Sequence, residues 1–110
     1  MTESDLDLLQ GTLDVLILKA LSLGPSHGYA VVSWIRARSD GAFRVEDRAL
    51  YVALHRLAAR GLLESEWGLS ENNRRARFYA LTAKGRRALR AKEAHWQRYA
   101  DAMFKVLGST

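Results

Sequence analysis

The sequence contains no cysteine and only one proline. The absence of cysteine excludes a disulfide-stabilised scaffold and a zinc site with thiolate ligands. The three histidines, His27, His55 and His95, lie in separate segments without the paired spacing of a metal site. The sequence also lacks a glycine-rich phosphate loop and a grouping of serine, histidine and aspartate. We therefore expect no enzymatic activity, no cofactor and no metal.

Long apolar segments are also scarce. The stretch from Leu13 to Leu23 is interrupted by Asp14 and Lys19, and it is shorter than the roughly 20 residues that a membrane-spanning helix needs. The acidic segment MTESDLDLLQ has the features of neither a signal peptide nor a transit peptide. With 110 residues, the chain is expected to form one domain of a cytoplasmic protein that does not enter a membrane.

Positive charge is concentrated in one part of the chain. The formal net charge is +5, yet residues 1–20 carry −3 and residues 74–98 carry +8. A basic segment of this density indicates a polyanionic partner such as nucleic acid, although a solvated helix face can have the same composition. The elements predicted around the segment bear on this choice.

Two helices are predicted in the first third of the chain. Residues Leu6–Leu23 are apolar on nearly all sides of a helix, which indicates burial against more than one surface, and Gly24–Pro25 ends this helix. A second helix is expected over about His27–Arg38, with Ser26 as its N-cap. Its buried face is expected to consist of Tyr29, Val32 and Ile35, with Trp34 beside them.

A third helix is predicted over about Asp47–Arg60, followed by Gly61 where a left-handed residue commonly ends a helix. Leucines spaced i, i+4 and i+7 form its inward face, namely Leu50, Leu54 and Leu57. A different face carries Arg48, Tyr51, Val52 and His55. This second face is the candidate contact for a partner.

After Gly61 the apolar period changes to two, which is typical of strands. Leu63–Trp67 and Phe78–Leu81 are predicted to pair as a hairpin. The turn falls at Glu71–Arg75, where asparagine tolerates a left-handed backbone. The turn and the strand after it carry the basic residues Arg74, Arg75 and Arg77.

Thr82 is predicted to cap a helix that continues to about Leu107. Some 25 residues span roughly 37 Å, which is more than a small domain needs. Its apolar residues follow a spacing of about 3.5, interrupted by Lys92, and comprise Leu89, Trp96, Tyr99, Met103 and Val106. Such a seam without an equally long partner in the same chain indicates a second copy of the chain.

Three helices, a two-stranded β-hairpin and a long helix, in this order, predict a mainly α winged helix-turn-helix fold. Residues 1–82 are expected to form the DNA-binding domain, with the first helix also in a dimer interface. Residues 83–110 are expected to form the dimerisation helix. In this fold the third helix enters the major groove and the hairpin, or wing, contacts the adjacent DNA backbone.

Several segments together resemble the PadR family of bacterial transcriptional regulators, in its short form with a single C-terminal helix. They are GTLDVLILKAL, the GPSHGY turn, ALYVALHRLAARGLL, ESEW, ENNRRARFYALTAKGRRAL and Trp96, and they span about residues 8–107. The resemblance implies a homodimeric repressor that binds a pseudo-palindromic operator in double-stranded DNA. It also implies a dimer interface between first and last helices, for which the candidates are Leu9, Leu13, Leu89, Trp96, Tyr99, Met103 and Val106.

DNA contacts are expected from the third helix and the wing, at Arg48, Tyr51, Val52, His55, Arg74, Arg75 and Arg77. Among these, Tyr51 and the three wing arginines match positions of the family pattern. Two positions depart from it. Arg48 and Ala49 stand where relatives usually carry a small residue and a serine or threonine, and Val52 stands where they often carry proline. The operator sequence therefore cannot be copied from relatives.

Trp96 has two open interpretations. A tryptophan on a seam commonly packs the interface. Some small members of the family sense hydrophobic drugs, however, and the resemblance then implies a pocket in which Trp96 and its symmetry mate stack on a flat, hydrophobic or aromatic small-molecule effector. The residues expected to line that pocket are Trp96, Leu9, Leu13, Leu16, Tyr99 and Met103.

A second function is compatible with the same residues. The basic wing and the last helix would then serve an interaction module that binds RNA or an acidic protein instead of duplex DNA. Salt-dependent binding to duplex DNA in preference to single-stranded RNA separates the two functions.

Overall fold

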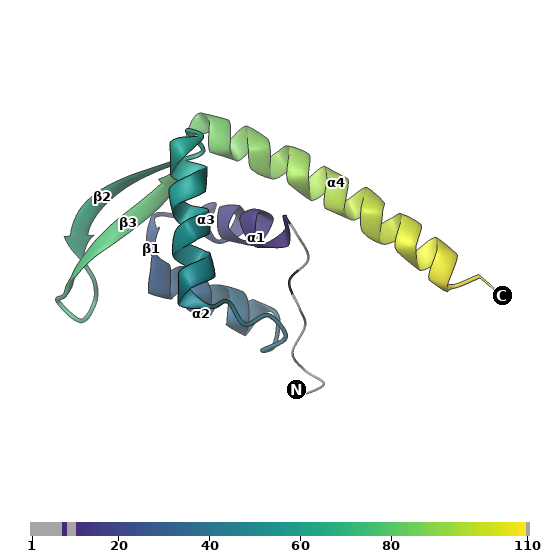
Figure 1. Ribbon diagram of the computed structural model, residues 1–110, viewed down its shortest axis with the longest axis horizontal. Helices are drawn as coiled ribbons and strands as arrows, with labels where there is room; N and C mark the ends of the chain where they lie inside the picture. Colours follow the sequence, from purple (N-terminus) through teal and green to yellow (C-terminus); the bar gives the residue numbers. More distant parts are fainter. Residues whose placement is uncertain (1–7, 9–10, 110) are drawn as a thin grey trace.

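The computed structural model describes residues 8 and 11–109. In this part of the chain the elements follow the order α1 (Thr12–Leu21), β1 (Ser26–His27), α2 (Gly28–Arg38), α3 (Asp47–Ala59), β2 (Leu63–Leu69), β3 (Arg75–Leu81) and α4 (Ala83–Leu107). The strands form an antiparallel sheet in the order β1-β3-β2. The β2–β3 hairpin and α4 leave the helical core in opposite directions (Figure 1). The predicted winged helix-turn-helix fold is confirmed.

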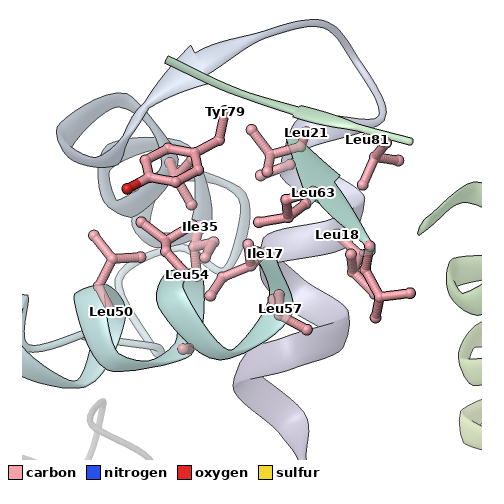
Figure 2. Packing of buried hydrophobic residues seen from close by; sticks show 14 of the residues in the cluster. Ile17, Leu18, Leu21, Ile35, Leu50, Leu54, Leu57, Leu63, Tyr79 and Leu81 are labelled. Carbon is pink, nitrogen blue, oxygen red and sulfur yellow. The ribbon is translucent and has the colours of Figure 1, made fainter. Parts of the chain in front are cut away.

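The hydrophobic core lies between α1, α2, α3 and the sheet. Figure 2 shows side chains from α1 and α3 meeting the strand residues Leu63, Tyr79 and Leu81. The predicted inward face of α3 is confirmed, because Leu50, Leu54 and Leu57 are all buried. Burial of each such leucine contributes about 1.5–3 kcal/mol, so this face holds α3 firmly against the core.

An ion pair joins α1 to α3. Asp14 lies almost buried in the first turn of α1, and its carboxylate accepts a hydrogen bond from the guanidinium group of Arg56 on α3. A carboxylate at this depth is costly without a charged partner. The pair therefore favours one orientation of α1 across α3.

The helix α1 is shorter than the predicted Leu6–Leu23. It starts after Gly11, whose φ of 85° lies in the left-handed region, and ends at Ser22, whose N–H donates to the carbonyls of Leu18 and Lys19. Leu6 lies outside the described residues. The predicted burial on more than one side is confirmed, since α1 contacts α2, α3, α4 and β3.

The buried face of α2 differs from the prediction. Val31 and Ile35 are buried, whereas Tyr29 is 75% exposed. Gly28 sets this orientation, because a Cβ atom there would lie only 2.9 Å from the hydroxyl oxygen of Tyr51 on α3. The first turn of α2 therefore lies directly on α3, and Tyr29 faces outward.

The predicted N-cap of α2, Ser26, was also wrong. His27 is the N-cap, and its Nδ1 accepts a hydrogen bond from the N–H of Ala30 at 3.2 Å. Ser26 and His27 form β1 and pair with Tyr79 and Phe78 of β3. Two residues are too few to show an alternating pattern, so the sequence carried no signal for this strand.

The start of α4 is held against the turn between α3 and β2. Thr82 Oγ1 donates to the carbonyl of Gly61 at 2.6 Å and accepts from the N–H of Gly85 at 3.0 Å. The N–H of Thr82 donates to the carbonyl of Leu62 at 3.1 Å. Both the predicted cap at Thr82 and the left-handed Gly61, with a φ of 78°, are confirmed.

Replacing Gly85 by alanine should destabilise the protein, although glycine to alanine normally stabilises a helix by about 0.5–1 kcal/mol. The new Cβ would lie 2.1 Å from the carbonyl oxygen of Leu62, a backbone atom that cannot rotate away. We expect the free energy of unfolding to fall by about 1–3 kcal/mol. Chemical denaturation at one fixed protein concentration measures this change.

The exposed Ala94 in the middle of α4 offers the control. Ala94→Gly should cost about 1 kcal/mol through helix propensity alone. A Gly85→Ala variant as stable as the parent would show that α4 does not approach the Leu62 carbonyl so closely.

Candidate nucleic-acid interface

The outward face of α3 is open to solvent. Arg48, Tyr51, Val52 and His55 are all exposed, on the side of the helix away from the three core leucines. Because those leucines anchor α3, this face is presented on a rigid element. The major groove of B-DNA, about 12 Å wide, admits a helix with such a face.

The wing is the β2–β3 hairpin, in register from Leu63 opposite Leu81 to Leu69 opposite Arg75. Its turn is ordered by backbone hydrogen bonds between Ser70 and Arg74 at 2.9 Å and between Asn73 and Ser70 at 2.8 Å. Asn73 has a φ of 58°, which agrees with the predicted left-handed asparagine.

The three wing arginines, Arg74, Arg75 and Arg77, are exposed. None of them forms an ion pair with a carboxylate in the part of the chain that the structure describes. Their positive charge is therefore not neutralised there, and it is available to an anionic partner.

The wing and α3 enclose a concave groove of about 700 Å³. Tyr51 and His55 line it from α3, and Arg74, Arg75 and Arg77 line it from the wing. The structure thus brings five of the seven candidate DNA-contacting residues to one groove. Arg48 and Val52 are not part of its lining and extend the exposed surface along α3.

The groove lining also includes residues that the sequence did not assign to it, among them the ring-bearing side chains of His27, Tyr29 and Trp67. His27 packs edge-on against Phe78 with ring centroids 5.4 Å apart, and its Nε2 lies 3.6 Å from Oε1 of Glu71 in the wing turn. The start of α2 is thereby linked to the wing. The helical spacing of α2 predicted a buried Tyr29, so nothing in the sequence indicated that this side chain is exposed.

A second candidate surface lies along α1 and α4. Two recesses, of about 570 and 420 Å³, share the half-buried Trp96 and Val15 as lining residues. The larger recess extends to Tyr99 and the smaller to Leu16. Leu13 is half-buried, and the candidate Leu9 lies outside the described residues.

Leu89, expected in the dimer interface, is instead part of the core of its own chain and only 5% exposed. The physical reason is that the start of α4 lies against the α3–β2 turn, where a Cβ on Gly85 would meet the Leu62 carbonyl, and Leu89 follows one helical turn later. The later part of α4 extends away from the core (Figure 1). The large apolar side chains that remain exposed on α4 are Tyr99, Met103, Phe104, Val106 and Leu107.

The described residues contain no group of three or more histidine, aspartate or glutamate side chains placed to bind a metal ion. No helix within residues 8 and 11–109 has both the length and the apolar character needed to cross a bilayer.

Known proteins share this sequence pattern and this fold. The model of the family described as "Transcriptional regulator PadR-like family" matches residues 17–91. A PadR family transcriptional regulator from Eggerthella lenta is 35% identical with a TM-score of 0.75, and the match covers 92% of this chain and 86% of that one. A transcriptional regulator from Clostridium thermocellum is 29% identical with a TM-score of 0.80, covering 91% and 97%.

A third solved structure shares the fold at lower identity. Bacillus subtilis PadR, determined in complex with operator DNA, is 22% identical with a TM-score of 0.64, and the match covers 72% of this chain and 45% of that one. The family match, which spans more than half of the chain, confirms the resemblance first seen in the sequence. The chain belongs to the PadR-like family of transcriptional regulators.

Proposed function

We propose that this chain is a homodimeric repressor that binds a pseudo-palindromic operator in double-stranded DNA through α3 and the wing. The observation that carries the proposal is the groove in which exposed side chains of α3 face wing arginines without carboxylate partners. Arginines of this kind suit phosphate oxygens, and an exposed helix face suits base edges. The operator complex of Bacillus subtilis PadR, which has the same fold, supports duplex DNA as the polyanion.

The two walls of the groove have different roles in this proposal. Arg74, Arg75 and Arg77 contact phosphates, which fixes the position of the protein on the duplex without selecting a sequence. The face formed by Arg48, Tyr51, Val52 and His55 enters the major groove. Arg48 lies in the first turn of α3, the end of a recognition helix that commonly reaches base edges.

Because the partner is chromosomal DNA, we propose the cytoplasm as the compartment.

Arg75→Ala and Arg48→Ala should weaken DNA binding in different ways. Loss of a phosphate contact is independent of sequence, so Arg75→Ala should weaken all duplexes alike and lower the slope of log K against log salt by about one. Loss of a base contact changes discrimination, so Arg48→Ala should alter the preference between operators by about 1–3 kcal/mol. Fluorescence anisotropy titrations at several salt concentrations measure both effects.

The first duplex to use is the DNA immediately upstream of the protein's own gene. Arg38→Ala is a matched control, because Arg38 is exposed on α2 and does not line the groove. A salt slope unchanged by Arg75→Ala would remove the wing from the interface. Tighter binding to single-stranded RNA than to duplex DNA at the same salt concentration would favour the alternative interaction module.

The exposed part of α4 supports the homodimer. Tyr99, Met103 and Val106 lie on the last turns of a helix that extends beyond the core. Soluble monomeric proteins rarely expose a contiguous apolar surface of this kind to solvent. We propose that residues 83–110 form the dimerisation helix, with residues 1–82 as the DNA-binding unit and α1 also at the interface. Two copies of α3 would then enter successive major grooves about 34–36 Å apart.

Met103→Glu combined with Val106→Glu should produce a monomer, because an apolar interface cannot bury two unpaired carboxylates. Both residues are exposed in the single chain, so the helical circular dichroism should be unchanged. Sedimentation equilibrium measures the mass. Ala94→Glu adds a carboxylate on the opposite face of α4 and should leave the dimer intact. An unaltered chain that sediments as a monomer at micromolar concentration would contradict the dimer.

The recesses around Trp96 support a proposal that a flat hydrophobic effector relieves repression. Trp96 already makes an edge contact with Tyr99, with ring centroids 5.6 Å apart, and both side chains line the larger recess. Each stacked aromatic pair contributes about 0.5–1.5 kcal/mol beyond burial. Such a ligand regulates only if it binds more tightly to one spacing of the two α3 helices. A ligand with equal affinity for both spacings does not shift the equilibrium between them.

Planar hydrophobic compounds should therefore quench the tryptophan fluorescence of the protein and weaken its affinity for the operator. Trp96→Phe should abolish this quenching, while Trp34 and Trp67 remain as the background signal. The same titration, repeated with operator bound, measures the coupling. If no compound in a panel of flat apolar molecules shows Trp96-dependent quenching, Trp96 serves only to pack the interface.

A further inference from the structure

Trp67 occupies an unusual position in the wing. It lies in β2 directly opposite Arg77 and is 55% exposed, outside the hydrophobic core. Packing in the core therefore does not account for this large aromatic side chain. Its ring contacts are with two arginines of the wing.

The indole ring of Trp67 holds two guanidinium groups. The guanidinium carbon of Arg75 lies 4.5 Å from the ring centroid, and that of Arg77 lies 5.5 Å away. Both distances fall within the range of about 6 Å over which the ring quadrupole attracts a cation. Arg77 is held a second time, because its Nε donates to Ser65 Oγ at 2.9 Å.

The two carboxylates of β2, on Glu64 and Glu66, do not orient Arg75 and Arg77. Alternation along β2 places Ser65 and Trp67 on one side of the strand and Glu64 and Glu66 on the other. Within the described part of the chain neither Arg75 nor Arg77 is ion-paired. A carboxylate would orient these side chains but also neutralise them, whereas an aromatic ring orients them and leaves their full charge to a polyanion.

We propose that Trp67 is a positioning residue, which orients Arg75 and Arg77 toward the phosphates of bound DNA. This inference rests on the proposed DNA-binding function of the groove, which Trp67, Arg75 and Arg77 all line. A free arginine side chain loses much rotamer freedom when it docks on a phosphate. Guanidinium groups already held over a ring lose less, so binding is tighter with the same set of phosphate contacts.

The test uses one mixed-sequence DNA duplex for every variant, because phosphate contacts do not depend on sequence. Trp67→Leu removes the ring and keeps both arginines. It should weaken binding by up to about five- to thirtyfold, the combined strength of two exposed cation–π contacts, while the salt slope stays near the wild-type value. Arg75→Ala, in contrast, should lower the slope by about one.

Two further measurements separate positioning from a direct or structural role of Trp67. Affinity should follow the ability of the ring to hold a cation, with Trp67→Tyr and Trp67→Phe between the wild type and Trp67→Leu. In a background that carries Arg75→Ala and Arg77→Ala, the change Trp67→Leu should have little further effect, because it then has nothing to orient. Thermal unfolding of all variants should differ little from the parent.

The possible outcomes distinguish failure of the proposed function from failure of the positioning role of Trp67. If the wild type shows no salt-dependent binding to the duplex, the proposed function fails and this inference fails with it. If the wild type binds and Arg75→Ala weakens it, but Trp67→Leu binds like the wild type, only the positioning role is overturned. An undiminished effect of Trp67→Leu in the double-arginine background would mean that the indole contacts DNA itself, which also overturns it.

Discussion

The wing and α4 both depend on one short junction at the end of α3. The carbonyl of Gly61 accepts a hydrogen bond from the Thr82 hydroxyl, and the carbonyl of Leu62 accepts one from the Thr82 N–H. The carbonyl of Arg60 accepts one from Nζ of Lys84 at 3.0 Å. Since β2 begins at Leu63 and β3 ends at Leu81, this junction closes both ends of the hairpin onto α3. The directions of the wing and of α4 are thus set by hydrogen bonds to the backbone carbonyls of residues 60–62.

Ion pairs join the helices of the core, whereas the arginines of the wing have no carboxylate partner among the described residues, which suits an anionic partner. The carboxylates of Asp14 and Glu93 are paired with Arg56 and Lys19, respectively, and these pairs join α1 to α3 and to α4. The wing arginines keep their charge. Over the Debye length of about 8 Å at physiological salt, that charge acts mainly on a partner close to the groove.

The sequence predicted best those features that a few neighbouring residues determine. The cap at Thr82, the left-handed Gly61 and Asn73, and the leucine face of α3 depend on local chemistry or on helical period, and all are present. The errors concern contacts between distant residues. The orientation of α2 depends on Gly28 meeting Tyr51, and the burial of Leu89 follows from Gly85 meeting Leu62, which no local pattern records.

The same limit applies to the groove. Charge and helical period predicted which residues of α3 and the wing are exposed. The inclusion of Tyr29, His27 and Trp67 depends on how separate elements meet in space. The contact of Trp67 with Arg75 and Arg77 required the register of the hairpin, which the turn position alone did not define.

The rigidity of the junction restricts how a regulator of this shape can respond to an effector. One wall of the groove comes from α3 and the other from the β2–β3 hairpin, whose first strand is separated from α3 only by residues 60–62. Strand pairing of β1 with β3 holds the other side of the wing. These contacts favour a groove that keeps its shape, so in the proposed dimer the proposed effector near Trp96 would act by changing the distance between the two grooves. Since the start of α4 is fixed to the same junction, a small rotation between the α4 helices of the proposed dimer would move both α3 helices relative to the DNA.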